Sequence, residues 1–266
     1  MKQTIKQALH AMFPEWTTAL MSARARAYSQ SLMADWGCRD LNRKLIERFG
    51  PTVQEGPFAG MVLGPMAEAE HLGPYLLGVY ESELDGAWDH VFRGTYTQIV
   101  DVGAKFGYYA VGLARRYPDV PVVAFDTDPW ARNAVREMSA ANRTGHVEVR
   151  GFCRPKWLAH GLRAGALVVC DCEGYESELF AEVTPALQSA TLVIETHDCF
   201  VPGISDHLRD VFASSHRILT IGETPDRRQS ALDLSFLNEA ERDLANREVR
   251  PPQVWLLCTP MVVASS

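Results

Sequence analysis

The stretch Ile99–Ala114, IVDVGAKFGYYAVGLA, constrains the fold of this chain more than any other. Two apolar residues lead into Asp101, and two glycines then precede an apolar run that continues to Ala114. This pattern predicts a buried strand, a glycine turn and a helix that begins at the turn. In a parallel α/β sheet such a turn lies at the carboxyl edge of the strands, where ligands bind and the first amides of the helix face them.

The spacing of the two glycines, Gly103 and Gly107, differs from the G-x-G-x-x-G of dinucleotide-binding proteins. The acid that precedes them, Asp101, can receive an ammonium group, whereas it would repel a pyrophosphate. S-adenosylmethionine carries an ammonium and a carboxylate at one end. We therefore predict that the turn binds S-adenosylmethionine, with a turn used only for packing as the alternative.

The rest of the chain alternates between strand and helix patterns. We expect a helix from Tyr80 to about Phe92, and further strands over residues 120–125, 146–149, 166–170, 192–195, 218–221 and 253–258. This alternation predicts a parallel sheet that is covered by helices on both faces. The last strand follows a long connection and is expected as an antiparallel edge. Residues 1–75 are predicted to form a mainly helical extension, and residues 76–266 the ligand-binding domain.

Polar residues follow the predicted second and third strands. Asp126 ends the second strand, where an acid can accept both hydroxyls of a ribose. Asp128 and Pro129 are a suitable N-cap and first residue for the next helix. The loop after the third strand, with Phe152 at its centre, is expected near the adenine.

Composition excludes several classes of function. The net charge of −7 argues against a nucleic-acid surface. The six cysteines form no C-x-x-C motif, so we expect reduced thiols in a cytoplasmic protein. No apolar run approaches the roughly 20 residues that a membrane-spanning helix needs. Composition therefore opposes a nucleic-acid partner and a membrane-spanning segment.

Four blocks of residues together resemble one family, the FkbM-like S-adenosylmethionine-dependent methyltransferases. The blocks are Asp101-Val102-Gly103-Ala104-x-x-Gly107, Phe125-Asp126-x-Asp128-Pro129, Asp171-Cys172-Glu173-Gly174-x-Glu176 and Ile194-Glu195-x-His197. The resemblance covers roughly residues 76–260. It implies a class I, Rossmann-like fold with a seven-stranded sheet and an antiparallel last strand. It also implies O-methylation of a hydroxyl on a sugar or natural product.

Two positions depart from the family pattern. Lys105 stands where the family usually has asparagine, and we expect its ammonium to pair with the methionine carboxylate of the cofactor. Asp126 replaces the usual glutamate. These departures leave open a module that binds S-adenosylmethionine without turnover. A nicotinamide-dependent oxidoreductase is a third possibility, which the missing G-x-G-x-x-G opposes.

A hydroxyl acceptor must lose its proton, and a positioned base contributes roughly 10²–10⁴ in rate. Asp171 is our first candidate for this base and is also expected to border the cofactor, while His197 is the second. Glu173 and Glu176 are expected to orient the acceptor or to cap the next helix. Each of these residues also has an ordinary alternative: Asp171 can be a helix cap, and His197 a simple loop residue.

A divalent cation is a separate possibility at the same edge of the sheet. Asp171, Glu195 and Asp198 follow or end neighbouring strands, and hard oxygen ligands suit Mg²⁺. Because spacing alone does not establish such a site, no metal is predicted.

Overall fold

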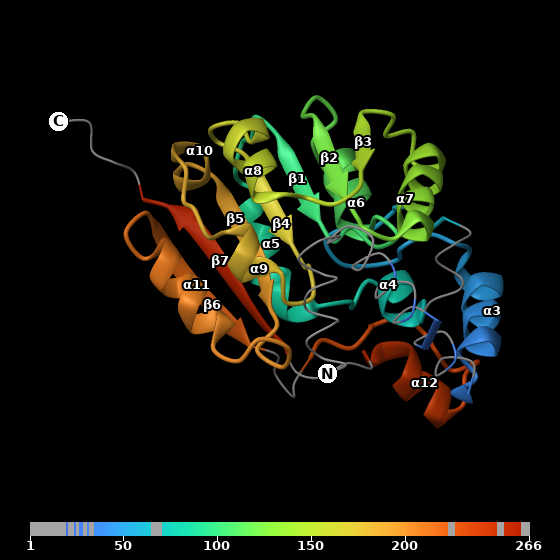
Figure 1. The fold of residues 1–266 in the computed structure, drawn as a ribbon. Helices are drawn as coiled ribbons and strands as arrows, with labels where there is room; N and C mark the ends of the chain where they lie inside the picture. Colours follow the sequence, from blue (N-terminus) through green and yellow to red (C-terminus); the bar gives the residue numbers. More distant parts are fainter. Residues whose placement is uncertain are drawn as a thin grey trace.

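A computed structural model describes residues 20, 24, 27, 28, 31, 35–64, 71–222, 227–248 and 253–261 (Figure 1). Its centre is a seven-stranded sheet with the order β3-β2-β1-β4-β5-β7-β6. The strands are β1 (Ile99–Val102), β2 (Val122–Phe125), β3 (Val147–Arg150), β4 (Leu167–Cys170), β5 (Thr191–Thr196), β6 (His216–Gly222) and β7 (Val254–Pro260).

The first five strands are parallel, and β7 runs antiparallel to both of its neighbours, β5 and β6. The predicted Rossmann-like α/β fold with an antiparallel last strand is therefore confirmed. The expectation that the last strand forms an edge of the sheet is wrong, because β7 lies inside the sheet and β6 is the edge. The side chains explain this order: Trp255, Leu256 and Cys258 of β7 are fully buried, whereas Leu219 of β6 is 55% exposed.

Helices cover both faces of the sheet (Figure 1). One face packs against α5 (Asp85–Val91), α6 (Tyr108–Arg116) and α7 (Pro129–Ala141). The other packs against α8 (Pro155–Gly161), α9 (Glu176–Leu179), α10 (Pro185–Gln188) and α11 (Ile204–Phe212). Each face thus has its own hydrophobic cluster, as an α/β sheet buried on both sides requires.

Three further helices gather at one end of the molecule: α3 (Cys38–Phe49), α4 (Gly73–Leu77) and α12 (Glu239–Asn246) (Figure 1). Lys44 of α3 bonds Glu241 of α12 at 2.6 Å. The connection between β6 and β7 therefore packs beside the amino-terminal part of the chain. Nothing in the sequence had indicated this contact.

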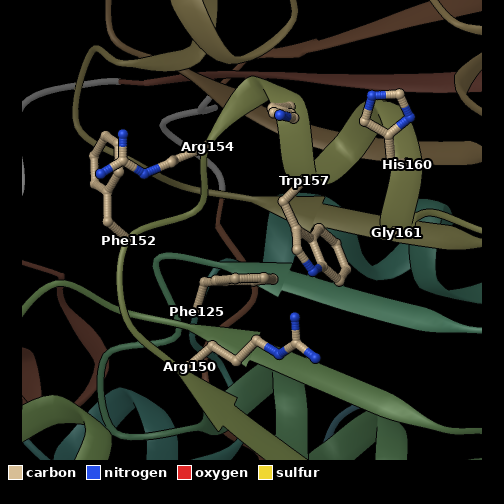
Figure 2. Close-up of a pocket in the computed structure, with 8 residues that line it drawn as sticks. Phe125, Arg150, Phe152, Arg154, Trp157, His160 and Gly161 are labelled. Carbon is tan, nitrogen blue, oxygen red and sulfur yellow. The ribbon is translucent and has the colours of Figure 1, made fainter.

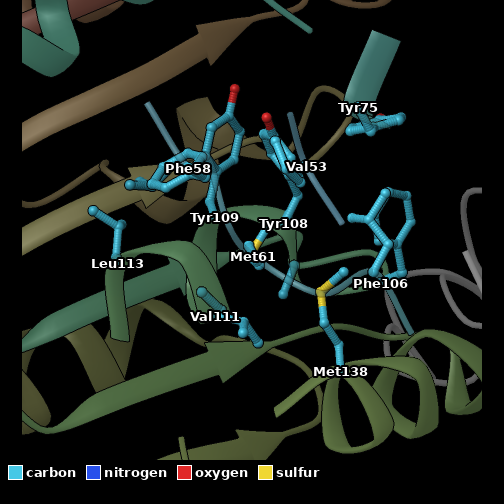
Figure 3. Close-up of a cluster of buried hydrophobic side chains, with 14 of the residues drawn as sticks. Val53, Phe58, Met61, Tyr75, Phe106, Tyr108, Tyr109, Val111, Leu113 and Met138 are labelled. Atoms are coloured by element: carbon cyan, nitrogen blue, oxygen red, sulfur yellow. The ribbon is translucent and has the colours of Figure 1, made fainter. Parts of the chain in front are cut away.

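The amino-terminal part shares a hydrophobic core with the sheet. Figure 3 shows Phe58 and Met61 packed among side chains of α6, with Met138 of α7 beside them. Phe58 makes an edge-on ring contact with Tyr108 at 5.2 Å. Adding a Cβ to Gly112 would place it 2.4 Å from the ring of Phe58, so this glycine is needed for the close approach.

Several local predictions can now be compared with the structure. Asp128 caps α7 by accepting the amide of Trp130, as predicted. The helix expected from Tyr80 begins later, as the 3₁₀ turn η2 (Ser82–Leu84) before α5, because Glu81 takes a left-handed conformation with φ 48°. Part of the helical character predicted for residues 1–75 is observed in α3, and much of that stretch lies outside the described residues.

Within the part of the chain that the structure describes, no helix is long and apolar enough to cross a membrane.

Candidate functional site

The parallel register brings the predicted site residues to one edge of the sheet. Val102, the last residue of β1, pairs with Phe125 on one side and with Cys170 on the other. The residues that follow these strands therefore meet at the carboxyl edge, the usual ligand-binding edge of such sheets. They include Gly103 and Asp171.

The glycine turn after β1 packs tightly against the loop after β4. Gly103 has φ +90°, and a Cβ there would lie 1.6 Å from the carbonyl oxygen of Asp171. The amide of Asp171 donates to the carbonyl of Val102 at 2.8 Å. Gly107, with φ +98°, then begins α6. Only glycine satisfies both the backbone conformation and the contact at position 103.

Asp101 lies under this turn and is only 2% exposed. Burial, together with the charges of Asp171 and Asp126, raises the pKa of Asp101 to about 8 against the opposing effect of the Ala110 amide. Its Oδ2 atom is buried without a hydrogen-bond partner among the described residues. A buried carboxyl oxygen of this kind fits a site for a ligand cation.

Asp126 joins the end of β2 to the glycine turn. One of its oxygens accepts the amide of Lys105 at 2.8 Å, and the other accepts the amide of Asp128 at 2.8 Å. Burial raises the pKa of Asp126 to about 6 in spite of these two hydrogen bonds. Each oxygen keeps a second lone pair, so the fixed carboxylate can still accept a hydroxyl.

The side chain of Lys105 extends toward α4. Its ammonium lies 3.5 Å from the hydroxyl of Tyr75 and 5.6 Å from the ring centroid of Phe106. It also interacts electrostatically with Glu173. The positive charge thus lies between the amino-terminal segment and the loop after β4, and its pairing with a cofactor carboxylate stays a prediction.

His197 is the centre of the acidic side of the edge. Its ring is 2% exposed, and Nδ1 lies 2.8 Å from Oε1 of Glu176. Nε2 faces three further carboxylates: Asp171 at 3.4 Å, Glu173 at 3.5 Å and Glu195 at 3.6 Å. The structure therefore brings Asp171, Glu173 and His197 together at this edge, and their catalytic roles stay a prediction.

The charges of this cluster shift one another's pKa values. Burial alone would lower the pKa of His197, but the bond to Glu176 and the charges of Asp171 and Glu173 raise it to about 8. The same bond holds the pKa of Glu176 below its usual range despite burial. Partial desolvation and the charge of Asp171 raise the pKa of Glu173 to about 7, although its side chain is still 71% exposed.

Two expectations for this edge need correction. Glu176 is fully buried, so it cannot orient an acceptor; it accepts the amides of Cys172 and Gly174 and holds the loop around His197. Asp198 accepts the amide of Gly203 at 3.1 Å and belongs to the turn before α11. Among the described residues, the ligand atoms of Asp171, Glu173 and His197 gather, whereas the possible Mg²⁺ ligands named from the sequence were Asp171, Glu195 and Asp198.

Phe152 lies in the wall of a cavity of about 530 Å³ beside α8 (Figure 2). Its ring is 5.0 Å from that of Tyr175, which precedes α9. The cavity is also lined by Phe125, Arg150 and Trp157, and the guanidinium of Arg150 lies over the Trp157 ring. Contact between Phe152 and an adenine stays a prediction.

The sequence analysis did not predict a buried cluster of polar and charged side chains that joins α6, the 3₁₀ turn η2 and the connection between β6 and β7. Tyr109 donates its hydroxyl to Glu81, which is 1% exposed, and the amide of Glu81 donates to Glu248 at 2.6 Å. Arg227 bonds both Glu83, at 3.1 Å, and Glu248. These residues come from distant parts of the chain, and no sequence spacing connects them.

No known protein-family model matches the chain, and no curated protein matches it in sequence. Solved structures do resemble it. A precorrin-6y C5,15-methyltransferase from Geobacter metallireducens is 13% identical, with a TM-score of 0.40, over 62% of this chain and 80% of that one. The O-methyltransferase TomG from Streptomyces achromogenes is 16% identical, with a TM-score of 0.45, over 68% and 80%. Values this low do not identify an activity.

Proposed function

We propose that this protein is an S-adenosylmethionine-dependent methyltransferase of the FkbM-like kind, which methylates a hydroxyl of a sugar or natural-product-like small molecule. The observation that carries the proposal is the carboxyl edge itself. It joins a glycine turn, a buried carboxyl with an unpartnered oxygen at Asp101, and an acidic cluster around His197.

The residues on the β1 and β2 side suit the cofactor. Asp101 faces the ammonium group, Asp126 accepts the ribose hydroxyls, and Lys105 serves the carboxylate. Gly103 and Gly107 keep the turn free of side chains, and Phe152 borders the adenine. When bound, the cofactor supplies a methyl group activated on a sulfonium, so the protein mainly orients donor and acceptor.

The residues on the β4 and β5 side suit the acceptor. The side chain of Asp171 is 28% exposed, whereas that of His197 is 2% exposed. Asp171 can therefore reach a bound hydroxyl and accept its proton, with Glu173 beside it at the surface. His197 lies beneath them as a positioning residue, held by Glu176.

The test is transfer of a labelled methyl group from S-adenosylmethionine to a panel of sugars and hydroxylated natural products, followed by mass spectrometry. We expect a labelled methyl ether with the native protein and a loss of about 10²–10⁴ in rate with Asp171→Asn. Asp198→Asn is the matched control and should keep its activity. Equal rates for the two variants would contradict the role of Asp171.

The alternative of a binding module without turnover makes a different prediction for the same experiment. A folded protein that binds S-adenosylmethionine and methylates no member of a broad panel would favour the binding module over the enzyme.

A further inference from the structure

The Nε2 atom of His197 has an unusual set of neighbours. It lies 3.4 Å from Oδ1 of Asp171 and 3.5 Å from Oε2 of Glu173. These distances exceed the roughly 2.7–3.2 Å of an N–H···O hydrogen bond. Oδ1 of Asp171 is buried and has no hydrogen-bond partner within the described ranges. The two carboxylates therefore contact Nε2 as ion pairs, at distances longer than a direct hydrogen bond.

The other ring nitrogen fixes the orientation of His197. Nδ1 is 2.8 Å from Glu176, which is itself held by the amides of Cys172 and Gly174. A carboxylate behind a histidine in this way is the usual support of a metal-binding imidazole, because it fixes the tautomer whose Nε2 lone pair is free. Binding of a cation would displace the proton that Nε2 carries in the metal-free protein, and the lone pair would then point toward Asp171 and Glu173.

The spacing agrees with ligation of one ion. Two ligand atoms at about 2.1 Å from a common cation lie about 3.0–3.4 Å apart, depending on the coordination geometry. The two distances to Nε2, 3.4 and 3.5 Å, lie at or just above the upper end of this range. All three ligand atoms lie within 4.8 Å of one another, so binding one ion needs a small inward shift, which the exposed side chain of Glu173 can make. We propose that Asp171, Glu173 and His197 together bind a divalent cation.

The ligand set indicates the class of divalent cation that would bind. One imidazole with two carboxylates favours Mn²⁺, Fe²⁺, Co²⁺ or Zn²⁺ over Mg²⁺, which prefers oxygen alone. Glu195, 3.6 Å from Nε2, adds negative charge nearby. Three protein ligands would leave coordination positions for water or an acceptor. The side chain of Glu173 is 71% exposed, so solvent reaches this site.

The use of this cation rests on the proposed function. An acceptor hydroxyl that coordinates the ion loses its proton more readily, because the cation stabilises the alkoxide. With Oδ1 of Asp171 on the ion, Oδ2 of the same carboxylate would remain to accept that proton. A sugar or catechol-like acceptor with two neighbouring oxygens would fill two open positions and be preferred.

The first experiment is titration of the metal-free full chain with Co²⁺, followed by the visible absorption of the bound ion, with no cofactor present. We expect one Co²⁺ per chain. Glu173→Gln and His197→Gln should each weaken binding at least about tenfold. Glu178→Gln, which removes an exposed carboxylate on the neighbouring helix α9, is the control and should bind as the native chain does.

Glu173 is exposed, so Glu173→Gln is expected to fold even if His197→Gln does not. Absence of a saturable Co²⁺ spectrum, or equal affinity in Glu173→Gln and Glu178→Gln, would overturn the metal site. S-adenosylhomocysteine binding is measured separately on the same samples. Co²⁺ binding without cofactor binding would keep the metal site and refute the proposed function, and the reverse result would refute only the metal site.

Discussion

A Cβ at Gly103 would lie 1.6 Å from the carbonyl oxygen of Asp171. The turn that is proposed to hold the cofactor and the loop that carries the candidate base are therefore in direct backbone contact. A hydrogen bond from the amide of Asp171 to the carbonyl of Val102 also joins them. The two halves of the site are thus positioned relative to each other by the protein backbone.

This contact predicts the effect of Gly103→Ala. The free energy of unfolding should fall by the strain of a positive φ and by more than about 2 kcal/mol in addition. The added methyl group would meet a backbone oxygen, which cannot turn aside as a flexible side chain can. Gly203→Ala is the matched control: its φ is +82°, but nothing lies within 4 Å of its Cβ position. That variant should lose only about 1–2 kcal/mol. Equal losses in urea unfolding would refute the close contact.

A second prediction concerns the buried ion cluster that joins the β6–β7 connection to the 3₁₀ turn. Arg227 lies between Glu83 and Glu248, whose side chains are 2% and 5% exposed. Arg227→Ala removes a guanidinium that contacts both buried carboxylates and should cost about 3–5 kcal/mol. Arg43→Ala, which removes an exposed ion pair on α3, should have little effect because solvent screens its charge. Similar unfolding midpoints for the two variants would show that the cluster is not a stabilising contact.

The pH dependence of cofactor affinity should report on Asp126. Its pKa is about 6 in the folded protein, with the Lys105 amide, Asp128 and Arg132 as its charged and polar neighbours. Only the ionised carboxylate accepts both ribose hydroxyls, so protonation of Asp126 should lower the affinity for S-adenosylhomocysteine as the pH drops through 6. This fall adds to the one that protonation of Asp101, with its pKa of about 8, causes at higher pH. The fall is at most about tenfold per pH unit.

The effect of Asp126 on the free energy of unfolding has the opposite dependence on pH from its effect on cofactor affinity. A carboxyl whose pKa is raised on folding favours the protonated state, so its contribution to the free energy of unfolding declines as the pH rises from about 4 to 6. Asp126→Asn should remove both effects and weaken binding at pH 7. A native-like pH profile of affinity in this variant would assign the titration to another group.

Much of the fold follows from local sequence patterns. The strand, glycine turn and helix from Ile99 to Ala114 are as predicted, because burial and backbone conformation there depend on neighbouring residues. The Asp128 cap was predictable for the same reason. The place of β7 inside the sheet depends instead on which strand pairs with β5, and pairing over such a distance along the chain leaves no local pattern.

The sequence indicates which residues lie together at the candidate site better than it indicates what each of them does there. Asp171, Glu173 and His197 follow adjacent strands, so their proximity follows from a parallel sheet. Whether Glu176 faces the acceptor or supports His197 depends on the loop conformation, which includes a left-handed residue at Glu173 with φ 58°. The ion cluster of Arg227 depends on contacts between distant segments, which the sequence does not encode locally.

Calorimetric titration with S-adenosylhomocysteine tests the central claim most directly, with NADH as a control and Asp101→Asn as the matched variant. We predict one site of micromolar affinity in the native protein, much weaker binding in Asp101→Asn, and no binding of NADH. A folded native protein that does not bind S-adenosylhomocysteine, or a folded Asp101→Asn variant with unchanged affinity, would contradict the proposed cofactor site.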